Sequence, residues 1–370
     1  MDYMPDENES WINGSNLTFL SSDDFQLPVI PKWGFWIKFL STPLIVIVGI
    51  VGNLLSFLVM KTKPLRRKSY SHYLCALAVF DTLTLIIRQV ESVDEYLVSY
   101  EKTKGVFQHF DDGSCKLFNF AVHVITLMCS WLVVIMAVER VIAVCFPFKK
   151  VYFRKEIGAA AAISLLFLIA CLTQSFRIVM VEHIVYDDRN NIRDCLAAKE
   201  YLNLYTSLDV YFYLWTLVFV LPIVFIIICN SIVLFHIFKV RKDLVNEENY
   251  LTYRNGRARE RRQKSTAMLL IVTFMYILTL FPLFTLSLIV DITIKIGSLE
   301  TARNTYVALK PFVDVSVSIS LLNYSGNFFI YILSGKRFRY ELLKLFRKSK
   351  PVKRCSTARS TREELFRYGS

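Results

Sequence analysis

Seven long apolar runs follow one another along the chain, separated by shorter polar segments. They lie near 35–61, 70–98, 113–145, 156–180, 207–239, 265–293 and 306–333. Each run is long enough to cross about 30 Å of hydrocarbon at about 1.5 Å of rise per helical residue. Lipid offers no hydrogen-bond partner for backbone groups, so helices are the expected form. The pattern predicts an all-α membrane protein, a seven-transmembrane helix bundle over 35–333.

The polar segments between the runs alternate in charge. Those at 61–68, 149–155 and 239–264 and the segment after 334 are basic, whereas the alternate ones carry Glu101, Asp111, Asp112, Glu182, Asp187 and Asp188. The positive-inside rule makes the basic segments cytoplasmic. We therefore expect a multi-pass protein of the plasma membrane, with its amino terminus outside.

Composition agrees with this placement. The 370 residues are 54% hydrophobic with a formal net charge of +13. The lysines and arginines lie between the apolar runs, where they meet anionic headgroups, so a membrane-lipid partner is favoured over nucleic acid. We predict no cofactor other than an allosteric ion.

Residues 1–34 are polar and acidic and precede the first run. They contain three Asn-X-Ser/Thr sequons, at Asn8, Asn13 and Asn16. These predict a glycosylated extracellular tail, the alternative being a plain disordered one. The start shows no cleavable signal pattern, so the first span is expected to act as the signal anchor.

Polar residues inside apolar runs need an explanation, because they are costly in lipid. Asn53, Asp81, Asn323 and Asn327 lie within the first, second and seventh runs. We expect them to face one another and to be satisfied through water or a bound cation, such as sodium at Asp81. The alternative is a polar cluster that only holds the helices together.

Other features mark the third, fifth and sixth runs. Glu139 and Arg140 lie at the inner end of the third run. They are expected to form an ion pair; the alternative is that Arg140 simply extends to the lipid headgroups. Cys115 opens the same run, and Cys195 is the other cysteine expected outside, so a disulfide between them is predicted. Pro222 and Pro282 predict bends or pivots in the fifth and sixth helices.

These residues together resemble the rhodopsin-like G-protein-coupled receptors. The resemblance rests on Gly52-Asn53, Leu77-Ala78-Val79-Phe80-Asp81, Cys115 with Cys195, Glu139-Arg140-Val141, Pro222, Asn327-Phe328-Phe329-Ile330-Tyr331 and Phe338-Arg339. The segments 323–331 and 334–339 look most like invertebrate neuropeptide receptors of the FMRFamide type. The resemblance implies a short amphipathic eighth helix over 334–348 and a cytoplasmic tail over 349–370. It also implies a heterotrimeric G protein as partner.

Some positions depart from the family pattern. Leu280 stands where a tryptophan is expected, so an aromatic switch would use Tyr276 or Phe281. Phe328 replaces the proline of the seventh helix, which predicts a smaller bend there. In the tail, Ser356, Thr357, Ser360 and Thr361 are candidate phosphorylation sites for arrestin recruitment, and Cys355 is a candidate lipidation site.

The ligand class follows from the outer ends of the helices. Val122 stands where an amine receptor needs a carboxylate, and Leu321 where a visual pigment needs a lysine, so both classes are disfavoured. An extracellular peptide suits the mixed charged and aromatic outer positions, and the resemblance to FMRFamide-type receptors implies an amidated end; the predicted ligand-binding residues are Glu91, His123, Gln174, Arg177, Asp209, Tyr213 and Asp314. One of the three carboxylates is expected to pair with a peptide arginine. The alternatives are interfacial residues without ligand contact, or a small lipid-like or amine-like ligand.

The implied mechanism is a two-state equilibrium that agonist shifts. Helices five and six would move about Pro222 and Pro282, and Arg140 and Tyr331 would then line a cleft for a G-protein helix. Arg261 and Arg262, rather than an acid, lie on the approach of the sixth helix to Arg140, so Glu139 would be its main restraint. A channel or transporter is disfavoured because internal repeats are missing. No nucleophile–base pair, metal cluster or phosphate loop indicates an enzyme.

Overall fold

The computed structural model describes residues 31–66, 68–101, 103–146, 156–187, 192–245 and 252–347. Side chains within 185–194 and 240–270 are not described. The predictions on Asn8, Asn13, Asn16, Cys355 and the four tail hydroxyls therefore lie outside the described residues, as do the side chains of Arg261 and Arg262.

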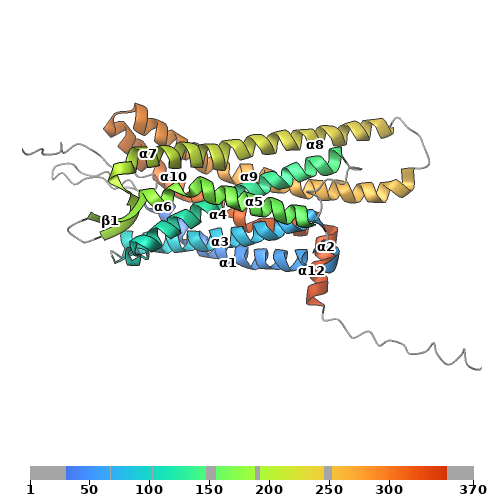
Figure 1. Cartoon of the computed structure of the whole chain (residues 1–370), viewed down its shortest axis with the longest axis horizontal. Coiled ribbons are helices and arrows are strands. Elements are labelled where there is room, and N and C mark those ends of the chain that lie inside the picture. Colours follow the sequence, from blue (N-terminus) through green and yellow to red (C-terminus); the bar gives the residue numbers. More distant parts are fainter. Residues whose placement is uncertain are drawn as a thin grey trace, which may run out of the picture.

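The described chain is an elongated bundle whose long helices run side by side along one axis (Figure 1). The elements in order are α1 (Trp33–Met60), α2 (Lys63–Arg66), α3 (Ser69–Ser99), η1 (Phe107–His109), α4 (Asp112–Cys145), α5 (Glu156–Gln174), α6 (Phe176–Met180), β1 (Val181–Asp187), β2 (Ile192–Ala197), η3 (Lys199–Tyr201), α7 (Leu202–Thr206), η4 (Ser207–Val220), α8 (Leu221–Val245), α9 (Thr252–Ile296), α10 (Leu299–Ser325), α11 (Asn327–Ser334) and α12 (Lys336–Phe346). Seven helical spans among the described residues are long and apolar enough to cross a membrane. The seven-helix prediction is confirmed.

Three spans are less regular than the sequence predicts. The fourth is interrupted at Ser175, between α5 and α6, and the seventh is interrupted at Gly326, between α10 and α11. The fifth begins as the π-helix η4 and becomes α-helical at Leu221, just before Pro222. The short α12 follows α11 after Gly335 and lies across the bundle axis in Figure 1.

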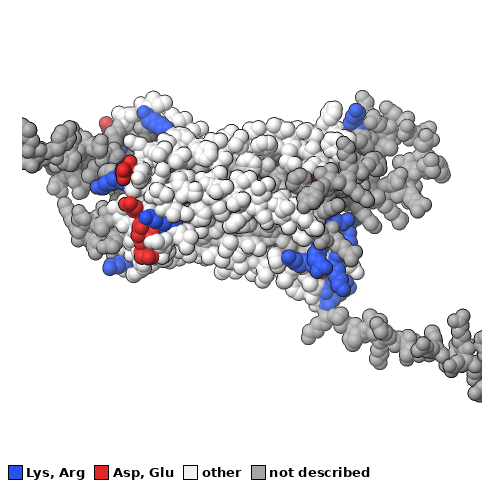
Figure 2. All heavy atoms as spheres, viewed as in Figure 1, with Lys and Arg blue, Asp and Glu red and all other residues white. Residues whose placement is uncertain are grey.

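Apolar side chains cover both the inside and the outside of the bundle. Leu77, Leu132 and Leu321 are buried in the shared core. Leu40, Leu44 and Ile47 on α1 are exposed, as a lipid-facing surface requires. In Figure 2 the charged side chains gather at the two ends of the long axis and leave an uncharged band between them.

The two ends of the bundle differ. One, called the hairpin end here, carries the antiparallel β1–β2 hairpin; the other, the α12 end, carries α12 with Lys336, Arg337, Arg339 and Lys344. The acidic side chains visible in Figure 2 lie mainly at the hairpin end. The hairpin was not predicted from the sequence.

A disulfide joins the hairpin to α4. Cys195 on β2 is bonded to Cys115, which confirms the predicted pairing. The Asp111 carboxylate caps α4 by accepting the backbone N–H of Ser114 at 3.1 Å. These hydrogen bonds from Ser114 hold the pKa of the Asp111 carboxyl below its ordinary value. Asp112 in turn accepts the backbone N–H of His183 at 3.1 Å, so the start of α4 is fixed to the hairpin twice.

Helices α1, α3 and α10 approach closely. A methyl group added at Gly49 would lie 2.8 Å from the Cβ of Ser325 on α10 and 2.5 Å from a methyl of Leu85 on α3. The absence of a side chain at Gly49 therefore permits this packing. The same three helices supply the charged cluster described next.

Candidate functional site

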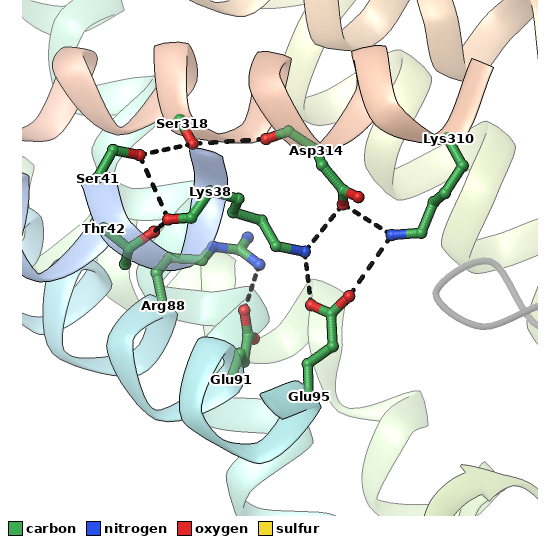
Figure 3. A network of polar contacts seen from close by, with 9 residues as sticks. All are labelled: Lys38, Ser41, Thr42, Arg88, Glu91, Glu95, Lys310, Asp314 and Ser318. Atoms are coloured by element: carbon green, nitrogen blue, oxygen red, sulfur yellow. Dashed lines mark hydrogen bonds and ion pairs between the residues drawn. The ribbon is translucent and has the colours of Figure 1, made fainter. Parts of the chain in front are cut away.

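Four charged side chains meet between α1, α3 and α10 at the hairpin end (Figure 3). This clasp consists of Lys38, Glu95, Lys310 and Asp314. The Lys38 ammonium donates to Glu95 at 2.5 Å and to Asp314 at 2.9 Å, and Lys310 donates to Asp314 at 2.7 Å. Ion pairs in low dielectric are expensive to separate, so the clasp fixes three helices relative to one another.

The clasp is buried on one side and accessible on the other. The side chains of Lys38 and Asp314 are 9% and 5% exposed, whereas those of Lys310 and Glu95 are 22% and 29% exposed. Lys310 and Glu95 are 3.6 Å apart, which is beyond hydrogen-bonding distance. The accessible edge is thus the loosest contact of the four.

A second cluster surrounds Arg177 on α6. Its guanidinium is fully buried and donates to Gln174 at 3.0 Å, to Tyr205 at 2.7 Å and to Asp209. The guanidinium carbon also lies 4.9 Å from the ring centre of Tyr213. A buried arginine that is satisfied by carboxylate, amide, hydroxyl and aromatic faces is a rigid support.

His123 extends the cluster towards α4. Its Nε2 lies 3.7 Å from Asp209, and its Nδ1 lies 2.6 Å from the Asn119 carbonyl. The Tyr213 hydroxyl donates to the His123 carbonyl at 3.1 Å. The Asp209 side chain is 27% exposed, so it is the accessible acid of this cluster.

The structure brings five of the seven predicted ligand residues together: His123, Gln174, Arg177, Asp209 and Tyr213. Asp314 lies in the clasp, and Glu91 pairs with Arg88 at 2.7 Å on α3. Gln174 and Arg177 are fully buried, which favours a role behind Asp209 over direct ligand contact.

Besides Lys310, four residues of these clusters lie outside the seven predicted ligand-binding residues: Lys38, Glu95, Asn119 and Tyr205. A signal existed for Lys38, a charged residue within the first apolar run, which calls for a partner by the rule applied to Asp81. Asn119 and Tyr205 carry no comparable signal, because their roles depend on where Arg177 points.

Polar residues also meet midway along the bundle. Asn327 donates to the Asp81 carboxylate at 2.8 Å, and Asn53 donates to the Tyr324 carbonyl at 3.1 Å. The Asn323 carbonyl lies 3.3 Å from the Asn327 amide nitrogen. Of the four predicted side chains, those of Asp81 and Asn327 contact each other, whereas Asn53 bonds the backbone of α10 and Asn323 contributes its backbone carbonyl.

The donor set at Asp81 fits a sodium ion in part. A hard cation takes oxygen ligands, and the buried Asp81 carboxylate supplies them. The neighbouring thiol of Cys129, 3.5 Å from the Thr84 hydroxyl, is a soft ligand and adds nothing for sodium. Asp81 is the residue that would supply the charged ligand for the ion.

Pro222 leaves backbone carbonyls of η4 without a helical donor, because proline has no N–H. An N–H at position 222 would donate to the carbonyl of Leu217 in a π-helix and to the carbonyl of Val218 in an α-helix. Trp131 on α4 donates to Leu217 at 2.9 Å, and Tyr276 on α9 donates to Val218 at 2.8 Å. Both carbonyls are therefore satisfied by side chains of other helices.

Tyr276 is buried, as an internal aromatic switch requires, whereas Phe281 is 58% exposed. Phe281 therefore points away from the core, which favours Tyr276 of the two predicted switch residues. Nearer the hairpin end, Phe284 stacks on Phe219 with ring centres 3.9 Å apart, next to Trp215. Pro282 lies inside α9 between these aromatic contacts and the Tyr276 hydrogen bond.

Glu139 and Arg140 pair at 3.2 Å at the α12 end of α4. Glu139 also accepts the Ser69 hydroxyl at 2.9 Å, and the Arg140 guanidinium lies 5.0 Å from the Tyr70 ring centre. The start of α3 thus holds both members of the pair. Tyr331 is buried and packs edge-on against Phe338 of α12, with ring centres 5.7 Å apart.

Seven membrane-spanning helices, a disulfide from the hairpin to α4 and a Glu-Arg pair at the opposite end define a helical membrane receptor. The model of the family "7 transmembrane receptor (rhodopsin family)" matches residues 52–331. The chain belongs to the rhodopsin family of seven-transmembrane receptors. Membership makes it a multi-pass G-protein-coupled receptor that responds to an extracellular ligand, and not an enzyme.

The chain is similar to curated receptors with different ligands. It is 26% identical to growth hormone secretagogue receptor type 1 of Rattus norvegicus over 303 residues, covering 81% of this chain and 78% of the relative. It is 23% identical to cysteinyl leukotriene receptor 1 of Sus scrofa over 312 residues, covering 82% of each. It is 30% identical to a probable G-protein coupled receptor of Caenorhabditis elegans over 130 residues, covering 35% of this chain and 30% of the relative. These relatives do not single out the FMRFamide type, so the expected subfamily stays a prediction.

Proposed function

We propose that the protein is a plasma-membrane receptor for an extracellular neuropeptide, with an amidated end as in FMRFamide-type ligands. The hairpin end faces outside with the amino terminus, and the α12 end faces the heterotrimeric G protein. The basic α12 end agrees with the positive-inside rule. Arrestin is a further proposed partner.

The balance of charges at the hairpin end carries the peptide proposal. The two clusters and the Arg88–Glu91 pair contain four basic and four acidic side chains: Lys38, Arg88, Arg177 and Lys310, with Glu91, Glu95, Asp209 and Asp314. Each acid contacts a base. A receptor for one small amine or one fatty acid needs an unmatched opposite charge. A peptide, with groups of both signs and many amides, suits paired and spatially spread charges.

A small apolar ligand is the second candidate. Trp215, Phe219 and Phe284 form an aromatic group between η4 and α9. Such a group would take an acyl chain or a ring as readily as a peptide side chain. The similarity to a receptor named for leukotrienes supports testing small apolar ligands alongside peptides.

The mechanism follows from the contacts that join the helices. Agonist at the hairpin end would favour the state in which α8 and α9 move at the α12 end. Tyr276 connects α9 to the Val218 carbonyl, one helical turn before Pro222, so this contact lies between the ligand end and the G-protein end of the movement. Release of Arg140 from Glu139 would then open the surface on which the G protein docks.

A sodium ion at Asp81 is proposed as an allosteric ligand of the resting state. The support is one buried carboxylate, of which a single oxygen accepts from Asn327. If sodium binds there, raising its concentration weakens agonist binding in the wild type but not in an Asp81→Asn receptor. Equal sodium effects on both receptors would reject the site.

The peptide proposal is tested in cells that express the whole chain and report calcium and cAMP. The cells are challenged with a peptide library and, separately, with lipids and amines. A nanomolar peptide response that is lost in an Arg140→Ala receptor present at the surface supports the proposal. A response to lipids alone would replace it with the second candidate. Staining of an amino-terminal epitope on intact cells tests the orientation.

A further inference from the structure

The accessible edge of the clasp offers unused hydrogen-bonding capacity. Lys310 has three ammonium N–H groups and donates one described hydrogen bond, to Asp314. Glu95 accepts from Lys38 through Oε2, while its Oε1 accepts no hydrogen bond from any residue that the structure describes. The edge thus presents two N–H groups of Lys310 and one oxygen of Glu95 that make no described hydrogen bond, with Lys310 Nζ and Glu95 Oε1 3.6 Å apart.

A third polar atom lies on α3, about one helical turn from Glu95. Ser92 precedes Glu95 by about one helical turn on α3 and is 5% exposed. Its hydroxyl has no hydrogen-bond partner among the described residues. A buried hydroxyl without a partner is costly, so this turn of α3 leaves a polar group unsatisfied close to Glu95 in the sequence.

The chemistry of the edge limits what completes it. A carboxylate only accepts hydrogen bonds, so one of its oxygens suits Lys310 while the other is repelled by Glu95. An ammonium only donates, and it meets the positive charges of Lys310 and Lys38. A primary carboxamide is neutral and carries an acceptor oxygen and an N–H₂ donor in one plane.

We infer that the edge formed by Lys310 and Glu95 is the subsite that binds a carboxamide of the ligand. The amide N–H₂ donates to Glu95 Oε1 and the amide oxygen accepts from Lys310. This assignment rests on the proposed peptide function and names the group of the peptide that the clasp recognises. The buried side of the clasp, Lys38 with Asp314, holds both residues in place and does not touch the ligand.

The test uses a peptide library in which every sequence is made twice, as the terminal amide and as the free acid. Whole cells expressing the full chain report calcium and cAMP. Active sequences are expected to lose about 10- to 100-fold in potency as free acids, because a hydrogen bond to a charged group is replaced by repulsion. If the carboxamide comes from a side chain, the same loss appears instead on Asn→Asp or Gln→Glu exchange within the peptide.

Two receptor variants move the amide-to-acid potency ratio in opposite directions. Glu95→Gln removes the repulsion and supplies a donor, so the ratio falls towards one. Lys310→Gln removes the attraction that a free acid still has, so the ratio grows. A purely structural role of the clasp would lower both potencies and leave the ratio unchanged.

Matched controls are Glu101→Gln and Lys116→Gln. Glu101 accepts from Tyr96 and Lys116 pairs with Asp112, both outside the clasp. They should leave the ratio as in the wild type. If Glu95→Gln fails to reach the surface, Lys310→Gln carries the test, since Lys38 still bonds Asp314 in that receptor.

The outcomes separate the two proposals. The subsite is overturned, but not the peptide function, if the amide and acid forms of each peptide are equally potent on the wild type. It is also overturned if Glu95→Gln, at a normal surface level, leaves the amide-to-acid potency ratio unchanged. Silence of the whole library at verified surface expression overturns both.

Discussion

The hydroxyl of Tyr276 on α9 donates a 2.8 Å hydrogen bond to the carbonyl of Val218 on η4. Val218 lies four residues before Pro222, and the missing N–H of that proline leaves a carbonyl free in the helix. Proline thus creates an acceptor in one helix that a side chain of another helix satisfies. The contact couples the fifth and sixth spans near the two prolines on which their movement depends.

Tyr276→Phe should therefore weaken this coupling without changing the size of the ring. We expect the free energy of unfolding to fall by about 1–2 kcal/mol, because a buried carbonyl loses its donor. Basal signalling should rise, since α9 is released from η4. Thermal unfolding of purified receptor and ligand-free G-protein activation in cells measure the two effects.

Tyr340→Phe is a suitable control, because Tyr340 is exposed on α12 and makes no described hydrogen bond. A Tyr276→Phe receptor with the melting temperature and the basal activity of this control would contradict the capping role.

The Glu139–Arg140 pair gives the second prediction. Glu139 holds Arg140 at 3.2 Å and is itself held by the Ser69 hydroxyl at 2.9 Å. Glu139→Gln should raise ligand-free signalling, because the neutral amide restrains Arg140 less. Ser69→Ala should raise it by a smaller factor, since the carboxylate stays but loses a donor. Basal second-messenger levels, normalised to the amount of receptor at the surface, measure both effects. An unchanged baseline in both variants would show that the Glu139–Arg140 pair does not hold the receptor in its inactive state.

The sequence predicts the number of spans, the disulfide and the Glu-Arg pair, because each depends on local pattern or on residue type. It does not predict the clasp, whose members are far apart in the sequence. Lys38 and Asp314, for example, are separated by 276 positions. Such contacts depend on which face of each helix turns inward. Periodicity within a lipid-facing helix indicates this poorly, because both faces are apolar.

The interruptions of the spans illustrate the same limit. Phe328 in place of proline predicts a smaller bend, yet the helix is interrupted at Gly326, two residues earlier. Proline is visible in a sequence as a helix breaker, but Gly326 depends on its surroundings to act as one. The hairpin was missed because its strands lie in a segment assigned only as a loop.

The disulfide supplies the third prediction. Cys115→Ser, Cys195→Ser and the double variant should behave alike, because each removes the same bond. The hairpin would keep only weaker contacts to α4, such as the Asp112 hydrogen bond to His183. We expect lost or strongly weakened agonist response and a free energy of unfolding lower by about 2–4 kcal/mol. Agonist titration and thermal unfolding test this; a double variant worse than either single one would show a second role for a free thiol.

Arg177 gives the fourth prediction. Its fully buried guanidinium bonds Gln174, Tyr205 and Asp209 at once, which an ammonium cannot do in the same geometry. Arg177→Lys should keep the charge but lower both the melting temperature and agonist potency, because Asp209 loses its fixed orientation. Normal agonist potency in this variant would show that the orientation of Asp209 does not matter for the ligand.

The buried side of the clasp gives the last prediction. Asp314→Asn leaves two lysines facing one carboxylate, and Lys38→Met leaves Glu95 without its hydrogen bond of 2.5 Å. Each should lower stability by about 1.5–3 kcal/mol, because a buried charged group loses one of its two hydrogen-bonding partners. The Lys38→Met/Asp314→Asn double variant removes one charge of each sign and leaves Lys310 beside Glu95, so its loss should be smaller than the sum of the two single losses. Thermal unfolding of the four receptors measures the coupling. Strict additivity would mean that the two side chains stabilise α1 and α10 separately, and the clasp would then not act as one unit.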